Sequence, residues 1–355
     1  MMISNLSGSY RVVLQIIAAI SIAGIISTHS HANTAQVAEN DTQTDSTAAA
    51  PLTELSEVDH QAIIIRSEGV RLAGDLYKPK KLPADAKIPG ILLVPGWGGN
   101  KENLKKYHAA HFAKQGFMVL AFDYKGWGES EGPLVPIDRL AITHDSTEID
   151  LRATHFRQVV DPYSMVADIR ASLNYLSGEH QVLHDNLGIW GTSFGGALAL
   201  VVAASDDRIK AYVDQMGPVN FSENYKSLPK KIARQMAVAT ARGELPAFPG
   251  PEVPKNPGLK GYPDWSALKR FDPMLLVDSL HAPTLIIDAE NEELFDRTKN
   301  GYLLHETIKD RLDSRYIMYP GKHYDLYKGD NRQAATKEAM NWFITYLKHD
   351  GSVGP

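Results

Sequence analysis

One serine lies on a short turn between an expected strand and an expected helix, and this feature constrains the fold more than any other. Residues 187–190 (Leu-Gly-Ile-Trp) are typical of a short buried strand, and the apolar run Ala197–Ala204 is long enough for a buried helix. Between them, residues 191–195 (Gly-Thr-Ser-Phe-Gly) match Gly-x-Ser-x-Gly, whose small residues permit a sharp, strained turn that exposes the serine. Such a pattern also occurs in ordinary loops, but the strand–turn–helix context predicts a nucleophile at Ser193.

A nucleophilic serine needs a base and an acid that orients the base, and candidates for both follow it in the chain. The strand Thr284–Asp288, which begins after a proline, runs into an acidic loop, and the later strand Arg315–Tyr319 ends in a turn that carries His323. We expect His323 to accept the Ser193 proton and to return it to the leaving group. The residues alone leave the acid open among four carboxylates at this strand end, namely Asp288, Glu290, Glu292 and Glu293.

The order of serine, acid and histidine resembles the α/β-hydrolase superfamily, whose catalytic residues follow each other in this order. In that superfamily a small residue follows the acid strand, and the acid comes three positions after it. This pattern maps onto residues 289–292 (Ala-Glu-Asn-Glu). The resemblance therefore implies Glu292 as the acid, a glutamate where aspartate is commoner.

Such a triad also requires N–H donors for the oxyanion that forms during acyl transfer. Phe194 follows the serine directly and is expected to supply one backbone N–H. The other donor is expected in the loop after the strand Ile91–Val94, where the superfamily's His-Gly-x-x-Gly is replaced by Pro-Gly-Trp-Gly-Gly at residues 95–99. The histidine is absent, but the donor is a backbone N–H, so the resemblance implies Trp97.

Three further segments narrow the resemblance. Residues 95–102, 122–132 and 321–327 look like the dienelactone-hydrolase-like branch, which shades into prolyl-oligopeptidase-type and Xaa-Pro-peptidase-type serine hydrolases. The resemblance covers residues 63–347, and its motifs are specific to the superfamily but not to a substrate. Asp123, inside the second segment, is expected to anchor a loop rather than to take part in catalysis.

The N-terminal residues are expected to direct export rather than to join the fold. Arg11 precedes an apolar stretch, Val12–Ile26, and small residues at Ser30 and Ala32 suit a signal-peptidase site. We therefore expect a signal peptide at residues 1–32, cleavage near Ala32, and a periplasmic or secreted protein without stable membrane association. An uncleaved N-terminal membrane anchor is the alternative. Residues 33–56 are polar and lack aromatics, which is typical of a disordered linker.

Composition excludes several kinds of partner. The formal net charge is −5 and no basic run occurs, so we expect neither nucleic acid nor an anionic membrane as a partner. With no cysteine, the chain can form neither a disulfide nor a cysteine metal site. His108 and His111 lie three residues apart on an expected helix, where we interpret them as surface side chains. No metal or cofactor is expected, the partner is a small ester-type substrate, and the oligomeric state is left open.

Residues 57–350 are expected to form one catalytic domain with an α/β-hydrolase fold, a doubly wound and mostly parallel sheet with a small cap insertion. The domain should open with an antiparallel hairpin, Gln61–Ser67 and Val70–Tyr77, and should close with the helix Arg332–Lys348. Two connections are long for this fold. The first, residues 133–160, is expected to contain a polar helical piece at His144–Gln158.

The second long connection, residues 221–272, is rich in aromatic residues and has a Pro/Gly-rich middle. We expect it to cap the pocket, with Tyr262 and Trp265 binding substrate, and a surface insertion without function is the alternative. The sequence thus predicts a secreted serine hydrolase that cleaves carboxylic esters, lactones included. An amide or peptide hydrolase with the same triad is the alternative, and a catalytically silent binding protein is disfavoured by the complete triad.

Overall fold

The computed structural model describes residues 57–139, 149–256 and 258–348. Their centre is an eight-stranded sheet with the strand order β1-β2-β4-β3-β8-β9-β11-β12. The expected hairpin forms one edge, where β1 (Val58–Ser67) pairs antiparallel with β2 (Val70–Pro79), and β2 pairs antiparallel with β4 (Met118–Phe122).

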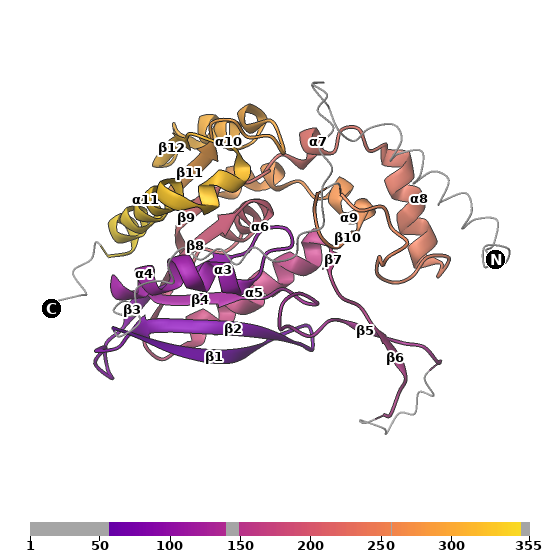
Figure 1. Cartoon of the computed structure of the whole chain (residues 1–355), viewed down its shortest axis with the longest axis horizontal. Coiled ribbons are helices and arrows are strands. Elements are labelled where there is room, and N and C mark those ends of the chain that lie inside the picture. The colour runs from indigo at the N-terminus through magenta and orange to yellow at the C-terminus, as the bar shows by residue number, and fades with distance from the viewer. Residues whose placement is uncertain (1–56, 140–148, 257, 349–355) are drawn as a thin grey trace.

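Every other pairing in the eight-stranded sheet is parallel. The remaining strands are β3 (Ile88–Val94), β8 (Val182–Thr192), β9 (Ile209–Gln215), β11 (Thr284–Ala289) and β12 (Ser314–Tyr319). Figure 1 shows the hairpin at one end of this stack of strands and β11–β12 at the other. The expected α/β-hydrolase fold, with its mostly parallel doubly wound sheet, is confirmed.

Alternate residues of the central strands face two separate hydrophobic cores. In β3, Leu92 and Val94 join the core on one face, whereas Ile91 and Leu93 join the core on the other. All seven residues of β3 are buried, which is typical of a parallel strand covered on both faces. Helices therefore have to cover both sides of the sheet.

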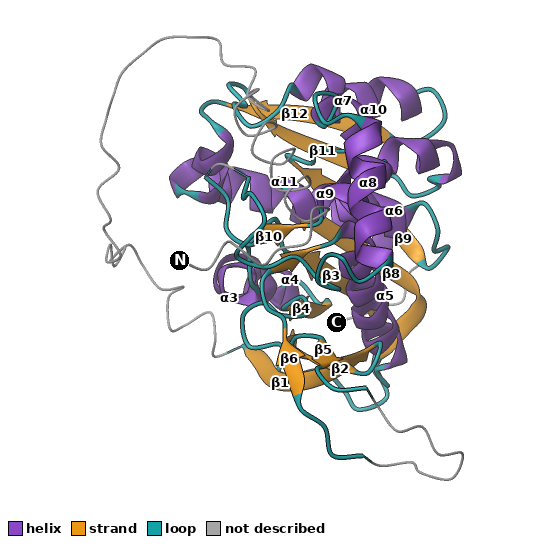
Figure 2. Cartoon of the chain, turned by 90° about the vertical axis from the view of Figure 1, so that its right-hand side faces the viewer, coloured by secondary structure: helices purple, strands orange, loops and turns teal. Residues whose placement is uncertain are grey.

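Figure 2 shows the helices on the two sides of the sheet. One face carries α5 (Pro162–Gly178), α6 (Phe194–Ala203) and α10 (Gly301–Ile308). The other carries α3 (Lys101–Leu104), a π-helical turn (Lys105–Ala109), α4 (Ala110–Lys114) and the closing helix α11 (Gly329–Leu347). Helix α5 begins where the sequence indicates, because the Asp161 side chain accepts a hydrogen bond from the N–H of Tyr163 and Pro162 occupies the first turn.

The prediction of a helix at His144–Gln158 is wrong for residues 149–158. Residues 140–148 lie outside the part of the chain that the structure describes. Ala153–His155 is a strand, β6, that pairs antiparallel with β5 (Leu134–Pro136). Gln158 has a φ of 58°, which is incompatible with a right-handed helix. A polar segment without an apolar stripe has nothing to bury as a helix, and here pairing between short strands satisfies its backbone instead. Figure 1 shows β5 and β6 projecting away from the sheet.

The segment 221–272 lies between β9 and β11 in the chain. It contains α7 (Phe221–Asn224), α8 (Lys230–Ala241), the short strand β10 (Tyr262–Pro263) and α9 (Trp265–Arg270). Strand β10 pairs with β7 (Val159–Val160), so the two long connections are joined to each other. Helix α8 buries Ala233, Met236 and Ala239, which lie on one helical face. Within the described residues, no helix is long and apolar enough to cross a membrane.

Candidate active site

Ser193 lies at the tight turn that joins β8 to α6. Its φ of 52° falls in the left-handed region, a conformation that costs a residue with a side chain about 1–3 kcal/mol. The flanking glycines are required by space, because a Cβ on Gly191 would lie 2.3 Å from the carbonyl oxygen of Gly195. A Cβ on Gly195 would lie 2.3 Å from the carbonyl oxygen of Pro95. The local sequence therefore specifies a strained turn, and this turn places the serine beyond the end of the strand.

The structure brings Ser193, His323 and Glu292 into one chain of hydrogen bonds. His323 Nε2 lies 3.0 Å from Ser193 Oγ, and His323 Nδ1 lies 2.7 Å from Glu292 Oε2. The side chains of His323 and Glu292 are 1% and 0% exposed. With a proton on Nδ1 donated to the carboxylate, Nε2 is left as the acceptor for the serine hydroxyl. This geometry allows the imidazole to take the serine proton while a buried carboxylate stabilises the imidazolium.

The four candidate acids occupy four different environments. Glu292 contacts the imidazole, whereas Glu293 accepts a hydrogen bond from the backbone N–H of His323 at 2.9 Å. Asp288 is buried inside β11 and accepts a hydrogen bond from Tyr316 Oη at 2.9 Å. Glu290 is exposed. The resemblance implied Glu292, and of the four it is the carboxylate that reaches the imidazole.

Phe194 and Trp97 lie beside the serine, as the sequence predicts. Phe194 is the first residue of α6, so its N–H has no acceptor within the helix and is available to an oxyanion. Trp97 follows β3, and its indole ring packs edge-on against the Phe194 ring, with the centroids 5.1 Å apart. The indole Nε1 donates to the carbonyl of Lys260 at 2.7 Å, which ties this loop to the 221–272 segment. Their function as oxyanion donors stays a prediction.

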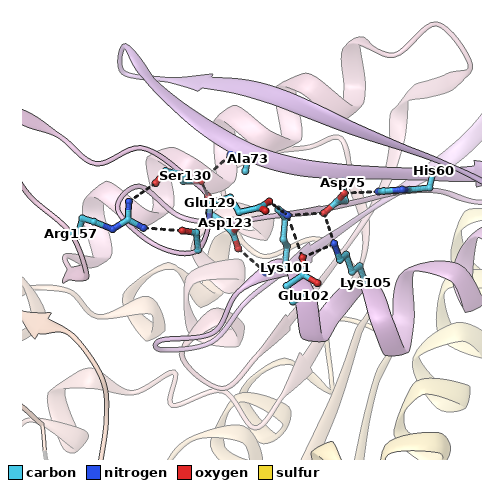
Figure 3. Close-up of polar contacts among 11 residues, drawn as sticks. His60, Ala73, Asp75, Lys101, Glu102, Lys105, Asp123, Glu129, Ser130 and Arg157 are labelled. Atoms are coloured by element: carbon cyan, nitrogen blue, oxygen red, sulfur yellow. Dashed lines mark hydrogen bonds and ion pairs between the residues drawn. The ribbon is translucent and has the colours of Figure 1, made fainter. Parts of the chain in front are cut away.

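A network of hydrogen bonds and ion pairs holds the end of the Trp97 loop in place where α3 begins (Figure 3). Asp123 accepts hydrogen bonds from the N–H groups of Lys101 at 2.8 Å and Glu129 at 3.0 Å, so it anchors a loop as expected. The Lys101 ammonium is 3% exposed and lies 3.0 Å from Asp75 and 2.6 Å from Glu129. Burial by itself would raise the pKa of Asp75. The hydrogen bonds from His60 and Lys101 together have the larger effect, so the pKa of Asp75 is lowered.

Tyr327 is a neighbour of the serine turn that the sequence analysis missed. Its hydroxyl lies 2.8 Å from Thr192 Oγ1, and Gln215 Nε2 donates to the same Thr192 oxygen at 3.3 Å. Burial raises the pKa of Tyr327 above its ordinary range, so the phenol stays neutral. The contact joins the histidine-bearing turn to the serine-bearing turn. Tyr327 ends the segment 321–327 that carries part of the family resemblance, but only the fold shows that its hydroxyl contacts the serine turn.

A cavity of about 1250 Å³ opens over the serine. Ser193, Phe194, Trp97 and His323 line it together with Asn224, Tyr225, Asn256 and Leu259 from the 221–272 segment. The cavity is large enough for a substrate well beyond a short-chain ester.

Tyr262 and Trp265 do not line this cavity, which corrects the expectation that they bind substrate there. The Trp265 ring is 6% exposed and donates its Nε1–H to the carbonyl of Pro254 at 3.0 Å. Tyr262 lies in β10, where it pairs with Val159. The Trp265 ring packs within the insertion against Tyr225, with the centroids 6.2 Å apart, and the Lys255 ammonium lies 5.3 Å from the centre of the Tyr262 ring. The aromatic residue that this segment contributes to the cavity is Tyr225.

His108 is buried rather than on the helix surface, which corrects a second expectation. It is 5% exposed, its Nδ1 lies 2.9 Å from Thr336 Oγ1, and its ring lies 4.7 Å from that of Trp190. Burial, with a smaller effect from Arg332, lowers the pKa of His108 to about 3, so the imidazole is neutral at pH 7. His111 is exposed, as expected. Within the described ranges, no group of three or more His, Cys, Asp or Glu side chains could hold a metal ion.

Two family models match the chain. The dienelactone hydrolase family matches residues 73–245, and the prolyl oligopeptidase family matches residues 162–350. With the fold described above, these matches show that the chain belongs to the α/β-hydrolase superfamily. Within it, the chain is a member of the hydrolase branch that joins the dienelactone hydrolase and prolyl oligopeptidase families.

Individual relatives are distant. An uncharacterized 31.7 kDa protein of Escherichia coli is 23% identical over 74% of this chain and 92% of its own length. The quorum-quenching protein AidA of Acinetobacter baumannii is 29% identical over 42% of this chain and 41% of its own length.

Solved structures with the same fold are at least as divergent. The hypothetical protein PA2218 of Pseudomonas aeruginosa has a TM-score of 0.58 and 19% identity, covering 88% of this chain and all of its own. The Butyrivibrio proteoclasticus protein Est1E, solved with ferulic acid, has a TM-score of 0.55 and 17% identity, covering 81% of this chain and all of its own. These likenesses show the fold alone.

Proposed function

We propose that the protein is a serine hydrolase that cleaves carboxylic esters through an acyl-enzyme. The observation that carries the proposal is the hydrogen-bond chain from Glu292 through His323 to Ser193, which opens into a cavity of about 1250 Å³. A buried carboxylate, a correctly oriented imidazole and an accessible hydroxyl are the parts that nucleophilic acyl transfer requires.

In the proposed reaction, Ser193 Oγ attacks the acyl carbon while its proton moves to His323 Nε2. The carbonyl oxygen becomes an oxyanion, which the N–H groups of Phe194 and Trp97 stabilise by hydrogen bonds. The tetrahedral intermediate collapses to the acyl-enzyme, and His323 returns the proton to the departing alkoxide. Water then repeats the sequence with His323 as the base, and this releases the acid and regenerates Ser193.

The main experiment is active-site labelling combined with substrate panels. A fluorophosphonate should label the purified protein at Ser193, and Ser193→Ala should abolish labelling. That variant should also lower kcat about 10⁶-fold, because the catalysis that remains comes from the oxyanion donors and binding alone. Stoichiometric labelling of one active-site residue in Ser193→Ala would contradict the proposal.

Peptide or amide hydrolysis is the second candidate, and the match to the prolyl oligopeptidase family favours it. The same triad performs both reactions, so the choice depends on the leaving group. Parallel kcat/KM measurements on acyl esters and aminoacyl amides decide between them. A higher value for the amides would replace the ester assignment but keep the triad.

We also propose that the protein is exported and cut after Ala32, which the apolar stretch of residues 12–26 supports. N-terminal sequencing of the protein from its native host tests this, because a chain beginning at Met1 in the cytoplasm would contradict it. Retention of a full-length chain in the membrane fraction would favour the anchor instead.

The 221–272 segment is proposed to select the substrate, with Tyr225 as the side chain to change first. Tyr225→Ala should alter relative kcat/KM among esters of different acyl size, because the ring borders the cavity. Phe248→Ala is the matched control from the same segment, and it should change stability rather than preference because its ring packs against Phe156 and does not line the cavity. Equal losses on every ester for both variants would contradict selection by Tyr225.

A further inference from the structure

One wall of the cavity above Ser193 carries positive charge that the proposed chemistry does not use. Lys106, Lys328 and Arg332 all line this cavity, and among the described residues no aspartate or glutamate lines it. The whole chain has a formal net charge of −5, so its acids outnumber its bases elsewhere. The positive wall is therefore a local feature and does not follow from composition.

These three cations differ from Lys101 and Lys105, which precede Lys106 in its helical segment. Lys101 and Lys105 are paired with carboxylates, Lys101 with Asp75 at 3.0 Å and Lys105 with Asp75 at 3.4 Å, as Figure 3 shows. In the part of the chain that the structure describes, no ion pair joins Lys106, Lys328 or Arg332 to a carboxylate. Their charges are thus available to a ligand.

Lys105 and Lys106 are consecutive in a helical segment, where successive side chains leave the axis roughly 100° apart and therefore face different surroundings. Residues 105–109 form a π-helical turn, which adds a residue to the turn and rotates the following side chains relative to a regular helix. Lys105 keeps the ion-pair network, whereas Lys106, Tyr107 and His108 line the cavity. The wall is completed by the start of α11, directly after the turn that holds His323.

Aromatic contact holds part of this wall in place. The Arg332 guanidinium carbon lies 3.8 Å from the centre of the Tyr107 ring, and the Lys106 ammonium lies 4.9 Å from the same centre. A stacked guanidinium has lost much of its freedom before a ligand arrives, and its planar fork matches carboxylate and phosphate groups. Apolar side chains, Trp97, Phe194, Tyr225 and Leu259, line other parts of the same cavity.

We infer that the substrate of this hydrolase is amphipathic and carries an anionic group, a carboxylate or a phosphate, that binds to Lys106, Lys328 and Arg332 while the ester lies at Ser193. This inference rests on the proposed function and names its substrate class. Charge-assisted hydrogen bonds to an anion are about twice as strong as neutral ones, so the wall would discriminate between charged and neutral substrates of equal size.

The test uses three esters that share one acyl group and one spacer but end in a carboxylate, a phosphate or a neutral carboxamide. The wild-type enzyme should show a kcat/KM at least about 10-fold higher for one or both anionic esters than for the carboxamide, with the preference weakening as salt is added. The better of the two anionic esters identifies the group. Equal rates on all three esters would overturn the inference.

Variants then assign the preference to the wall. Arg332→Gln should lower the ratio of kcat/KM for the anionic ester to kcat/KM for the neutral ester about 10-fold. The double variant K106Q/K328Q should lower this ratio by the same amount. Because both lysines are exposed, that variant disturbs no buried contact. Lys337→Gln is the matched control, because this exposed lysine on α11 does not line the cavity. An equal fall in the ratio for Lys337→Gln would show a general field effect and overturn the assignment.

The outcomes separate this inference from the proposed function. Hydrolysis of all three esters with Ser193 labelled, but without a charge preference, contradicts the anionic substrate alone. Absence of both ester hydrolysis and labelling contradicts the proposed function and the inference with it.

Discussion

Two buried carboxylates four residues apart, Asp288 and Glu292, lie in opposite electrostatic settings. Glu292 is in the loop after β11, where it meets an imidazole that can become positive at 2.7 Å. Asp288 is still inside β11, where burial, with a smaller contribution from the nearby Glu292, raises its pKa to about 7 despite the hydrogen bond from Tyr316. The difference shows that position relative to the strand end decides what this acid segment can do, because Glu292 reaches the imidazole from the loop whereas burial within β11 makes Asp288 favour its neutral form.

Asp288 also faces a second acid across the sheet. Asp214 on β9 is fully buried, and desolvation together with Asp288 raises the pKa of Asp214 well above its ordinary value. The two strands are neighbours, with Ile286 opposite Asp214. The sheet beneath the active site therefore holds two acids that resist ionisation, in strands next to the loop that carries Glu292.

The largest expected effect tests Glu292, the member of the comparison that contacts the imidazole. Glu292→Gln should lower kcat about 10⁴-fold, because an amide no longer stabilises the imidazolium or holds the imidazole in the required tautomer. Glu290→Gln, in the same loop but exposed, should change kcat less than about threefold. Steady-state kinetics on one ester measure both variants. A severe loss in Glu290→Gln with a mild loss in Glu292→Gln would move the acid to Glu290.

The next effect concerns the stability contributed by Asp288. Its folded-state pKa is about 7 and its unfolded value lies near 4, so the folded protein binds more protons between these values and loses stability as the pH rises through this window. Asp288→Asn should remove this slope and keep an acceptor for Tyr316. We expect about 2–4 kcal/mol of relative stabilisation at pH 8 and almost none at pH 4.

Urea denaturation of wild type and Asp288→Asn from pH 4 to pH 8 measures this difference. Asp313→Asn is a suitable control because its carboxylate has an exposed partner, Tyr346, and should leave the slope unchanged. Parallel pH profiles for wild type and Asp288→Asn would show that Asp288 ionises normally and would remove the contrast with Glu292.

A smaller effect sharpens the comparison with a third buried carboxylate, Asp75, which is surrounded by cations. Lys101→Met removes the ammonium that lies closest to Asp75 and should lower the free energy of unfolding by about 3 kcal/mol. This value is at the low end for a broken buried ion pair, because Lys105 and His60 still contact Asp75. Lys309→Met breaks a half-exposed pair with Glu306 and should cost less than about 1 kcal/mol.

Denaturant titrations measure both lysine variants, and kcat provides a second measurement. Because Lys101 directly follows the Trp97 loop, Lys101→Met should also lower kcat modestly if the network positions that loop, and Lys309→Met should not. Equal destabilisation by the two substitutions would show that the buried network contributes no more than a surface pair.

The sequence alone determined the features that depend on contiguous residues or on chain order. The glycines around Ser193, the apolar strand before it and the helix after it are encoded within about twenty residues, so local sterics specify the turn. The alternation of strands and helices predicted the parallel sheet, because such connections have few compact solutions. Chain order then placed an acid loop and a histidine turn after the serine.

Only the tertiary structure decided which distant side chains meet. Lys106 and Arg332 are more than two hundred residues apart, and their shared cavity wall depends on how α11 packs against the π-helical turn. The contact of Tyr327 with Thr192, the burial of His108 and the exclusion of Trp265 from the cavity have the same origin. Sequence patterns report which face of an element is apolar, but the partner of a polar side chain depends on strand order and register, which place residues together from anywhere in the chain.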